Sequence, residues 1–374
     1  LKKMKLSNIL SILEEMAPLG YAEDFDNVGL LVGNQEAEVS GVLVCHDALE
    51  AVIEEAIQES CNVVVCFHPI IFSGLKKITG KDYVERAVLK AIKNDIAIYA
   101  VHTALDNHPN GVNQLFCNAL GLTQTKILIP KAHYIYKLTT FTVPENVQKV
   151  KTALFAAGAG KIGNYEECSF VSEGTGTYKG GDDSNPVIGN RHELMEVKEI
   201  KIEVTFEKHL HSKIIKALVE NHVYEEVAYE VVSLENKHQN IGLGMIGELP
   251  QEMEEKAFLE MIKEKMQCGG IRHSAYLGKP IKRVAVLGGS GSFAISAAKN
   301  AGADVFLTAD LKYHQFYESE NQMIIADIGH FESERYTKNY IVDFLKEKIT
   351  NFAPALSKSN IVLSKENTNP VKYL

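Results

Sequence analysis

Three short apolar runs, separated by amphipathic segments, constrain the fold of this chain more than any other feature. The runs cover residues 42–45, 61–67 and 96–101, and their many β-branched side chains are typical of strands buried on both faces. Residues 49–58 and 83–93, which lie between the runs, carry apolar side chains at helical spacing. This alternation of strand and helix predicts a largely parallel sheet with right-handed crossovers.

The last third of the chain returns to the same pattern, with buried strands expected at residues 283–287, 305–308 and 323–326. A helix is expected over residues 335–349, where apolar side chains again follow helical spacing. We therefore predict a two-lobed α/β fold. Its lobes are expected at residues 1–127 and 236–374.

The stretch between the two lobes has a different texture. Alternating strands are expected at residues 134–143, 200–206 and 227–234, with helices at residues 147–157 and 212–221. The order β-α-β followed by β-α-β suggests a ferredoxin-like α+β module. We read residues 128–235 as a domain inserted between the two lobes.

Composition narrows the class of protein. The chain has 374 residues, 45% of them hydrophobic, and its net charge of −9 gives no basic footprint for nucleic acid. Six scattered cysteines without a CxxC pair favour reduced thiols in a cytoplasm-like compartment. We find neither an apolar stretch of membrane-spanning length nor a secretory leader, so a cytoplasmic location without a membrane partner is expected.

Side chains able to bind a metal follow the carboxyl ends of several expected strands. His68 follows the second apolar run, His102 and Asp106 follow the third, and His330 follows residues 323–326. Glu334 lies four residues after His330, which places the two side chains on one face of a helix. Because the carboxyl ends of parallel strands share one edge of a sheet, we expect these residues to converge.

Each of these residues also has a structural explanation. His68 can simply end a strand, His102 can cap the turn at Asp106, and His330 can hydrogen-bond Glu334 at the surface. Taken together, imidazoles and carboxylates favour Zn, Mn, Fe, Co or Ni over Ca or Mg. One bridging carboxylate could hold two such ions about 3.5–4 Å apart.

Other features are weaker. The glycine turn at residues 288–292 could cradle a phosphate or simply join a strand to a helix. Asp310 and His314 could support the metal ligands or be ordinary surface residues, and His222 is more typical of a helix-to-strand connection than of a ligand site. No serine or cysteine has the context of a catalytic nucleophile.

Four motifs together resemble one known family. They are HPIIF at residues 68–72, HTALDN at residues 102–107, DNVGL at residues 26–30 and GHFESE at residues 329–334. The chain resembles the Nif-three-like family, often labelled "GTP cyclohydrolase I type 2 homologue", over essentially its whole length. The resemblance implies a dinuclear metal site between two lobes, a PII/CutA-like inserted domain, a toroidal homohexamer and a GTP ring-opening hydrolase activity.

Carried over to this chain, the metal ligands of the family fall on His68, Asp106, His330 and Glu334. His102 matches a histidine often found close to the metals, and we expect it to move protons in catalysis.

One departure from the family pattern concerns the metals directly. The family usually has two adjacent histidines before the proline, but here Phe67 holds the first position. This leaves a single metal, a weakened second metal, or a substitute ligand such as His46 or Cys66. A lesser departure is Ala104, where many relatives have asparagine.

Three functions compete at this point. The first is a hydrolase that uses one or two divalent metal ions per chain on a nucleotide-like or otherwise phosphorylated small molecule. The second is a non-catalytic ring-forming adaptor or metal-trafficking protein, which the loss of a histidine at Phe67 favours. The third, nucleic-acid binding inside a ring, is opposed by the acidic balance.

Overall fold

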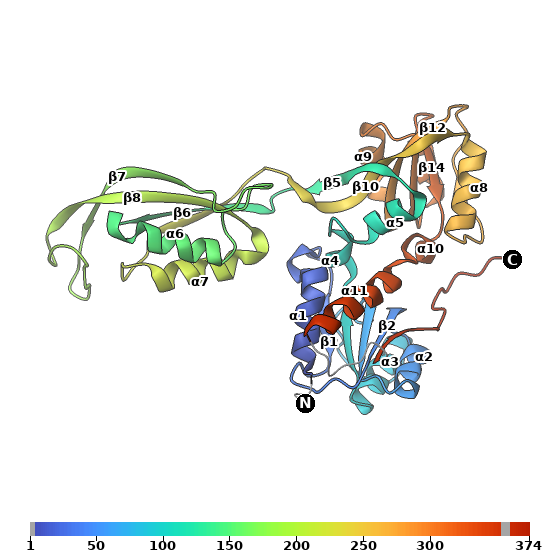
Figure 1. Cartoon of the computed structure of the whole chain (residues 1–374), viewed down its shortest axis with the longest axis horizontal. Helices are drawn as coiled ribbons and strands as arrows, with labels where there is room; N and C mark the ends of the chain where they lie inside the picture. Colours follow the sequence, from blue (N-terminus) through green and yellow to red (C-terminus); the bar gives the residue numbers. More distant parts are fainter. Residues whose placement is uncertain (1–3, 353–359) are drawn as a thin grey trace. The chain divides into compact units, whose positions relative to one another are not determined.

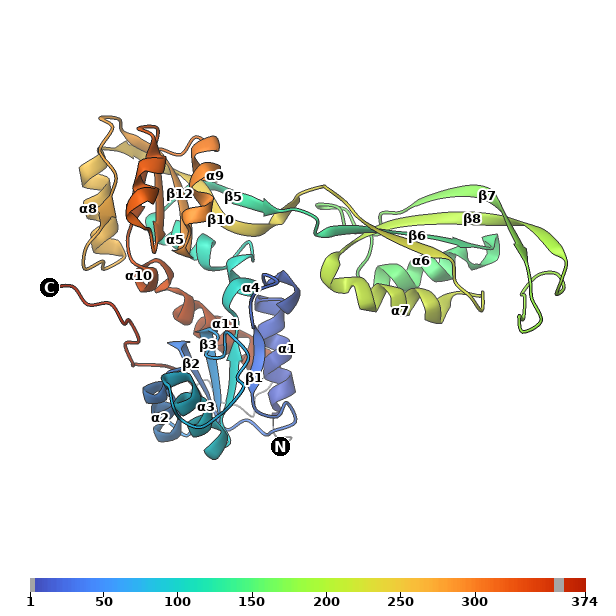
Figure 2. The same ribbon diagram turned by 180° about the vertical axis from the view of Figure 1, so that it is seen from behind.

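The computed structural model describes residues 4–352 and 360–374. The chain forms two compact units, labelled by element in Figures 1 and 2. The discontinuous unit joins Leu1–Pro130 to Gln239–Leu374, and the inserted unit is Lys131–His238. The predicted α/β architecture is confirmed, with several sheets and helices packed on them.

The first sheet of the discontinuous unit carries the strands expected near the start of the chain. Its order is β1-β4-β3-β2-β15, in which β2, β3, β4 and β15 run parallel and β1 pairs antiparallel with β4. Core side chains of α1 and α11 cover one face, and those of α2 and α3 cover the other. The elements are β1 (Gly29–Val32), β2 (Val42–Asp47), β3 (Val63–His68), β4 (Ala97–Ala100), β15 (Ile361–Leu363), α1 (Leu6–Met16), η1 (Leu19–Tyr21), α2 (Glu50–Gln58), α3 (Tyr83–Lys93), α4 (His102–Asp106) and α11 (Thr337–Phe352).

The second sheet of this unit has the order β11-β14-β13-β12-β10-β5. Its central strands β12, β13 and β14 are parallel, whereas β10 and β11 pair antiparallel with their neighbours. Side chains of α5 and α8 pack on one face and those of α9 on the other. The elements are β5 (Thr123–Lys131), β10 (His238–Met253), β11 (Arg272–His273), β12 (Ile281–Ser290), β13 (Val305–Ala309), β14 (Ile324–Asp327), α5 (Val112–Leu120), α8 (Glu255–Lys265), η4 (Ser292–Ala294), α9 (Ile295–Asn300), η5 (Tyr313–Ser319) and α10 (His330–Glu334).

The helix expected over residues 335–349 is α11, Thr337–Phe352, and it does not contain His330 and Glu334. His330 and Glu334 lie on the separate short helix α10, and α11 begins only at Thr337. Between the two helices, Arg335 is anchored by hydrogen bonds to the carbonyl oxygen of Met266 and to the side chain of Gln267. The expected spacing still holds, because His330 and Glu334 are one turn apart on α10.

The inserted unit is an antiparallel sheet with two helices packed against it. The strand order is β7-β8-β6-β9, and every neighbouring pair is antiparallel. Apolar side chains of α6 and α7 form a core with those of β8. The elements are β6 (Ile135–Thr142), η2 (Pro144–Asn146), α6 (Val147–Ala156), β7 (Phe170–Lys179), β8 (Leu194–Glu207), η3 (Lys208–Leu210), α7 (His211–Asn221) and β9 (Tyr229–Ser233).

Two features of the whole chain bear on its environment. All six cysteines are free thiols, and five of them are buried. Within the described residues, none of the helices combines the length and the apolar character required to span a lipid bilayer.

Candidate metal centre

The end of β3 and the start of α10 bring three predicted ligands together in the discontinuous unit. His68 is the last residue of β3, and α10 follows β14, the strand of the second sheet that ends at Asp327. Gly329, with φ of 95°, makes the turn that starts α10. Residues separated by more than 260 positions in the chain therefore meet at one site.

The ligand atoms of this group form a triangle with equal sides. His68 Nε2 and His330 Nε2 each lie 3.3 Å from Glu334 Oε2, and the two nitrogens lie 3.3 Å from each other. Ligands bound tetrahedrally to one ion at about 2.0–2.1 Å are separated by about 3.3–3.4 Å. The triangle therefore has the spacing of three ligands of a single cation.

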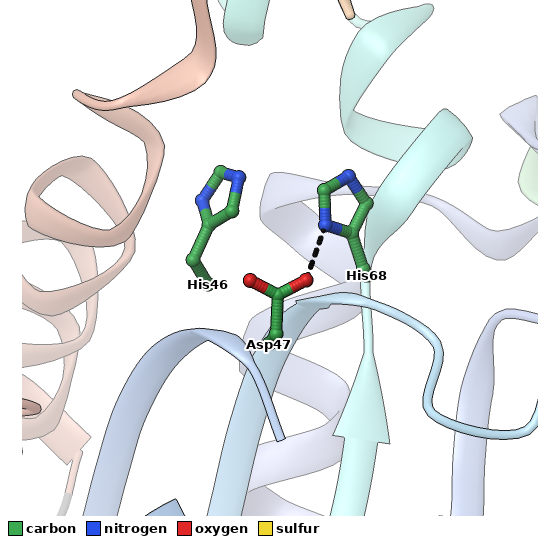
Figure 3. A group of neighbouring side chains, drawn as sticks. All are labelled: His46, Asp47 and His68. Carbon is green, nitrogen blue, oxygen red and sulfur yellow. Dashed lines mark hydrogen bonds and ion pairs between the residues drawn. The ribbon is translucent and has the colours of Figure 1, made fainter. Parts of the chain in front are cut away.

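A carboxylate behind each imidazole aims the ring at this triangle. The Nδ1–H group of His68 donates to Asp47 Oδ1 at 2.8 Å, as Figure 3 shows, and that of His330 donates to Asp310 Oδ2 at 2.6 Å. Such a hydrogen bond fixes the tautomer and leaves the Nε2 lone pair free to bind a metal. Both rings are thus held in the orientation that metal-binding histidines adopt.

The charges of the site also favour a cation. Burial opposes the charged form of His68, but Glu334 and Asp47 outweigh it and raise the pKa of His68 to about 9. Burial likewise opposes protonation of His330, yet Glu334 and Asp310 raise its pKa to about 11. Burial would raise the pKa of Glu334, but the charges of His330 and His68 hold this pKa well below its usual range. The carboxylates therefore stabilise positive charge at this site, and a divalent ion can supply that charge in place of the ring protons.

Asp106, the fourth expected ligand, lies beside this group. Its Oδ1 atom is buried and finds no hydrogen-bond partner in the described residues. Burial, followed by the negative charge of Glu334, raises the pKa of Asp106 well above its usual range. Asp106 does not belong to a group of described residues whose possible ligand atoms all lie within 4.8 Å of one another. An unpaired carboxylate oxygen at this place fits a cation, because a buried polar atom without a partner is costly.

His102, expected to move protons, is adjacent to the triangle. Its ring centroid is 5.3 Å from that of His68, and its Nδ1–H group donates to Asp26 Oδ1 at 2.8 Å. The other oxygen of Asp26 accepts hydrogen bonds from the backbone and the hydroxyl of Thr103. His102 is therefore oriented by a carboxylate in the same way as His68.

The structure distinguishes the two residues considered as substitutes for the histidine missing at position 67. His46 Nε2 lies 3.2 Å from Glu334 Oε2, so His46 joins the cluster. The Sγ atom of Cys66 donates instead to the carbonyl oxygen of Tyr99, and burial raises the pKa of this thiol well above its usual value. Cys66 is a core residue on the other face of the sheet.

Asp47 and Asp26 were not predicted to be site residues, yet they lie behind His68 and His102. A signal for Asp47 was present, because it follows the apolar run 42–45 and pairs with His68 in the parallel register of β2 and β3. Asp26 lies in a polar turn, and no strand pairing links it to His102 in the sequence.

The remaining candidate features have structural roles. At the glycine turn, the Gly288 and Gly289 N–H groups donate to Asn113 and Ser333, so these two cannot serve a phosphate. A side chain at Gly289 would collide with Glu334, and its φ of 70° also requires glycine. Both ring nitrogens of His222 are hydrogen-bonded within the inserted unit, and His314 packs against tyrosine rings.

A cavity of about 440 Å³ opens beside the triangle. His68 and Asp47 line it together with Phe72 and Tyr83, whose side chains are mostly exposed. The ring of Phe72 is 6.3 Å from that of His102. A small molecule in this cavity would lie against aromatic surface and beside the imidazole of His68.

Comparison with known proteins gives one consistent result. The family model described as Duf34/NIF3 (NGG1p interacting factor 3) matches residues 4–370. A Bacillus subtilis protein named "GTP cyclohydrolase 1 type 2 homolog" is 36% identical, with 100% of both chains covered. A Halalkalibacterium halodurans protein of the same name is 35% identical, covering 99% of this chain and 100% of its own.

Solved structures agree over the full length. A Bacillus cereus protein described as related to NIF3 has a TM-score of 0.80 and 38% identity, with 100% of each chain covered. A Staphylococcus aureus protein has a TM-score of 0.76 and 29% identity over the same share of both chains. With the family model matching almost from end to end, the chain belongs to the Duf34/NIF3 family.

Proposed function

We propose that this protein binds divalent transition-metal ions through His68, His330, Glu334 and Asp106, and hydrolyses a nucleotide-like or phosphorylated small molecule. The observation that carries the proposal is the 3.3 Å triangle of ligand atoms with a carboxylate behind each imidazole. Nitrogen and carboxylate ligands favour Zn, Mn, Fe, Co or Ni. Such an ion, when bound, would lower the pKa of a water molecule, so that hydroxide is available as a nucleophile at neutral pH.

The residues around the triangle support the chemistry in defined ways. His102, oriented by Asp26, would take up or deliver a proton at its Nε2 atom. Phe72 and Tyr83 would hold a planar group by stacking in the adjoining cavity. These features suit a purine nucleotide, and the name of the relatives makes GTP the first substrate to assay.

The proposal is tested with metal-loaded protein. Zn- or Mn-loaded wild type should turn over GTP or a related nucleotide, and Asp106→Ala should reduce the rate at least about tenfold, because metal binding weakens. Asp182→Asn is a matched control, since Asp182 forms an ion pair with the exposed His192 in the inserted unit. Absence of turnover at full metal occupancy with every nucleotide assayed would refute hydrolysis and leave metal binding.

A non-catalytic adaptor or metal-trafficking protein is the second candidate. Phe67 favours it, because this side chain is fully buried and cannot bind metal where the resembling family has histidine. A trafficking protein should exchange its metal freely with a chelator within minutes, whereas a hydrolase should retain it through turnover. Following metal loss to a coloured chelator separates the two functions.

We also propose that the inserted unit is a ferredoxin-like, PII/CutA-like domain and that the protein is a cytoplasmic homohexamer. The strand order β7-β8-β6-β9, antiparallel throughout and packed against two helices, supports the domain assignment. Light scattering after size exclusion would test the assembly. A mass other than six times 41.4 kDa would contradict it.

A further inference from the structure

His46 is a buried histidine for which the described residues supply one polar side-chain partner, Glu334. It lies on β2, one residue before Asp47, and only 3% of its surface is exposed. Its Nε2 atom is 3.2 Å from Glu334 Oε2. Its Nδ1 atom is buried and has no hydrogen-bond partner within residues 4–352 and 360–374. A buried polar atom in this state is rare and costly unless something else satisfies it.

Strand geometry places His46 beside Phe67. The register of the parallel strands pairs Cys45 with Cys66, so the next residues, His46 and Phe67, are also neighbours. Alternation along each strand sends both side chains to the face covered by α1 and α11, where Val44 and Val65 also lie. Their ring centroids are 5.3 Å apart. The imidazole of His46 on β2 thus lies next to Phe67 on β3, the position at which the family usually has a histidine.

A packing role does not explain a histidine here. The ring centroid of His46 is 5.3 Å from that of Phe67 and 5.1 Å from that of Phe331. An aliphatic side chain would fill such surroundings without burying polar nitrogens. A simple hydrogen bond to Glu334 is also a poor explanation, because Oε2 is already in contact with two other imidazoles. One oxygen contacted by three imidazole nitrogens is expected when the oxygen and the nitrogens share cations.

Unsatisfied atoms gather around this carboxylate. Five buried side-chain atoms lack a hydrogen-bond partner in the part of the chain that the structure describes, and two of them belong to His46 and Asp106. Both residues interact with Glu334, His46 through its Nε2 atom and Asp106 through its charge. A second cation beside the His68–His330 triangle would give the buried Asp106 oxygen a partner and would explain why His46 Nε2 faces an oxygen that two other imidazoles already contact.

We propose that His46 is a metal ligand, which supplies from β2 the imidazole that Phe67 cannot supply from β3. The inference rests on the proposed metal site and extends it with a divalent transition-metal ion held by His46 and bridged to the first through Glu334.

The test removes the imidazole from position 46 and then adds one at position 67. Wild type, His46→Leu, and the double variant His46→Leu with Phe67→His are loaded with Co²⁺, dialysed, and measured for bound metal per chain and for the visible absorption of the ion. We expect about two equivalents in wild type, about one in His46→Leu with an altered spectrum, and recovery towards two in the double variant. His314→Leu, which removes a histidine outside the cluster, should keep two equivalents.

The outcomes separate this inference from the proposed function on which it rests. A wild type without bound Co²⁺ would refute the metal site itself. Equal metal content in wild type and His46→Leu would overturn only the role of His46. A loss in His46→Leu that the folded double variant does not restore would assign His46 a purely structural role and would also overturn the inference. If His46→Leu fails to fold, His46→Asn provides the same comparison, with circular dichroism as the check on folding.

Discussion

Glu334 in the discontinuous unit and Glu207 in the inserted unit are both flanked by histidines, but they hold them differently. Glu334 offers a single oxygen, Oε2, to three imidazole nitrogens at 3.2–3.3 Å. Glu207 uses one oxygen for each ring, Oε1 for His238 at 3.1 Å and Oε2 for His209 at 3.4 Å. The second arrangement is ordinary ion pairing, because each nitrogen has an oxygen of its own.

Burial and the surroundings of the rings separate the two clusters further. The Glu334 side chain is 3% exposed, whereas that of Glu207 is 29% exposed. Behind His68 and His330 stand carboxylates that fix the tautomer, but the Nδ1 atom of His209 contacts the hydroxyl of Tyr134. Residue types alone therefore do not make a metal site. The proposed metal site rests instead on the oxygen shared by several nitrogens and on the carboxylates behind His68 and His330.

The largest effect is expected from Glu334→Gln. This change keeps the shape of the side chain but removes the charge that the three imidazoles share. The affinity for Zn²⁺ should therefore fall by more than the roughly 10- to 100-fold expected when a residue that hydrogen-bonds a metal ligand is lost. Glu207→Gln is the matched control and should retain the metal content of wild type. Isothermal titration with Zn²⁺ measures both. Equal losses in the two variants would erase the difference between the clusters.

Changes behind the rings should have intermediate effects. Asp47→Asn and Asp310→Asn should each weaken Zn²⁺ binding about 10- to 100-fold, since the ring behind which each carboxylate stands loses its fixed tautomer. Asp182→Asn removes a similar contact with His192, at 2.8 Å, but from an exposed pair, and should leave the affinity unchanged. If all three variants bound as wild type does, orientation by carboxylates would not matter at this site.

Acidification should destabilise the inserted unit through Glu207 and His209. Burial would raise the pKa of Glu207, but its hydrogen bond with His238 lowers it, so the stability that Glu207 contributes is present above the unfolded pKa of about 4.3 and is lost as pH falls. Burial lowers the pKa of His209, which makes its protonation below about pH 6.5 unfavourable in the folded state as well. The unit should therefore be less stable at pH 5 than at pH 7 because of His209, and should lose the contribution of Glu207 below about pH 4.3.

Urea unfolding followed by the methyl NMR signals of Val150 and Leu154, which lie in the core of the inserted unit, reports on this unit. In Glu207→Gln the free energy of unfolding at pH 7 should fall by on the order of 1 kcal/mol, the usual scale of such partly exposed pairs. Below about pH 4.3, where the wild type loses the contribution of Glu207, the pH dependence should become shallower. A dependence identical to that of wild type would show that the Glu207 cluster does not stabilise the unit.

The smallest effect is expected at Thr368, whose hydroxyl donates to Asp47 Oδ2. Thr368→Val should weaken Zn²⁺ binding less than about tenfold, because Asp47 keeps its bond to His68. Thr368→Ser retains the hydroxyl and should bind as wild type does. A loss as large as that of Asp47→Asn would mean that Thr368, rather than the carboxylate, sets the orientation of the ring.

The alternation of strands and helices predicted the parallel core of both sheets, since continuous β-branched runs have few other uses. The long strand β10 was missed, because Gly242, Gly244 and Gly247 resemble loop sequence. The short strand β15 was missed as well. Its three residues join the first sheet from the far end of the chain, a pairing that no local pattern encodes.

The candidate site was predictable as a set of residue types but not as a geometry. Strand ends and the spacing of His330 and Glu334 indicated which side chains could meet. The direction of the His68 ring depends on Asp47, which the register of β2 and β3 places beside it. The direction of the His330 ring depends on Asp310, whose backbone is left-handed with φ of 57°. The contact of His46 with Glu334 depends on the packing of α10 near β2, which a sequence pattern does not specify.

The most direct test of the account is anomalous scattering from crystals grown with Zn²⁺. The account predicts a peak about 2.0–2.1 Å from His68 Nε2, His330 Nε2 and Glu334 Oε2. No peak is predicted at Glu207. An empty triangle at full Zn²⁺ saturation, or a peak at Glu207 instead, would contradict the claim that the shared oxygen of Glu334 marks a metal site.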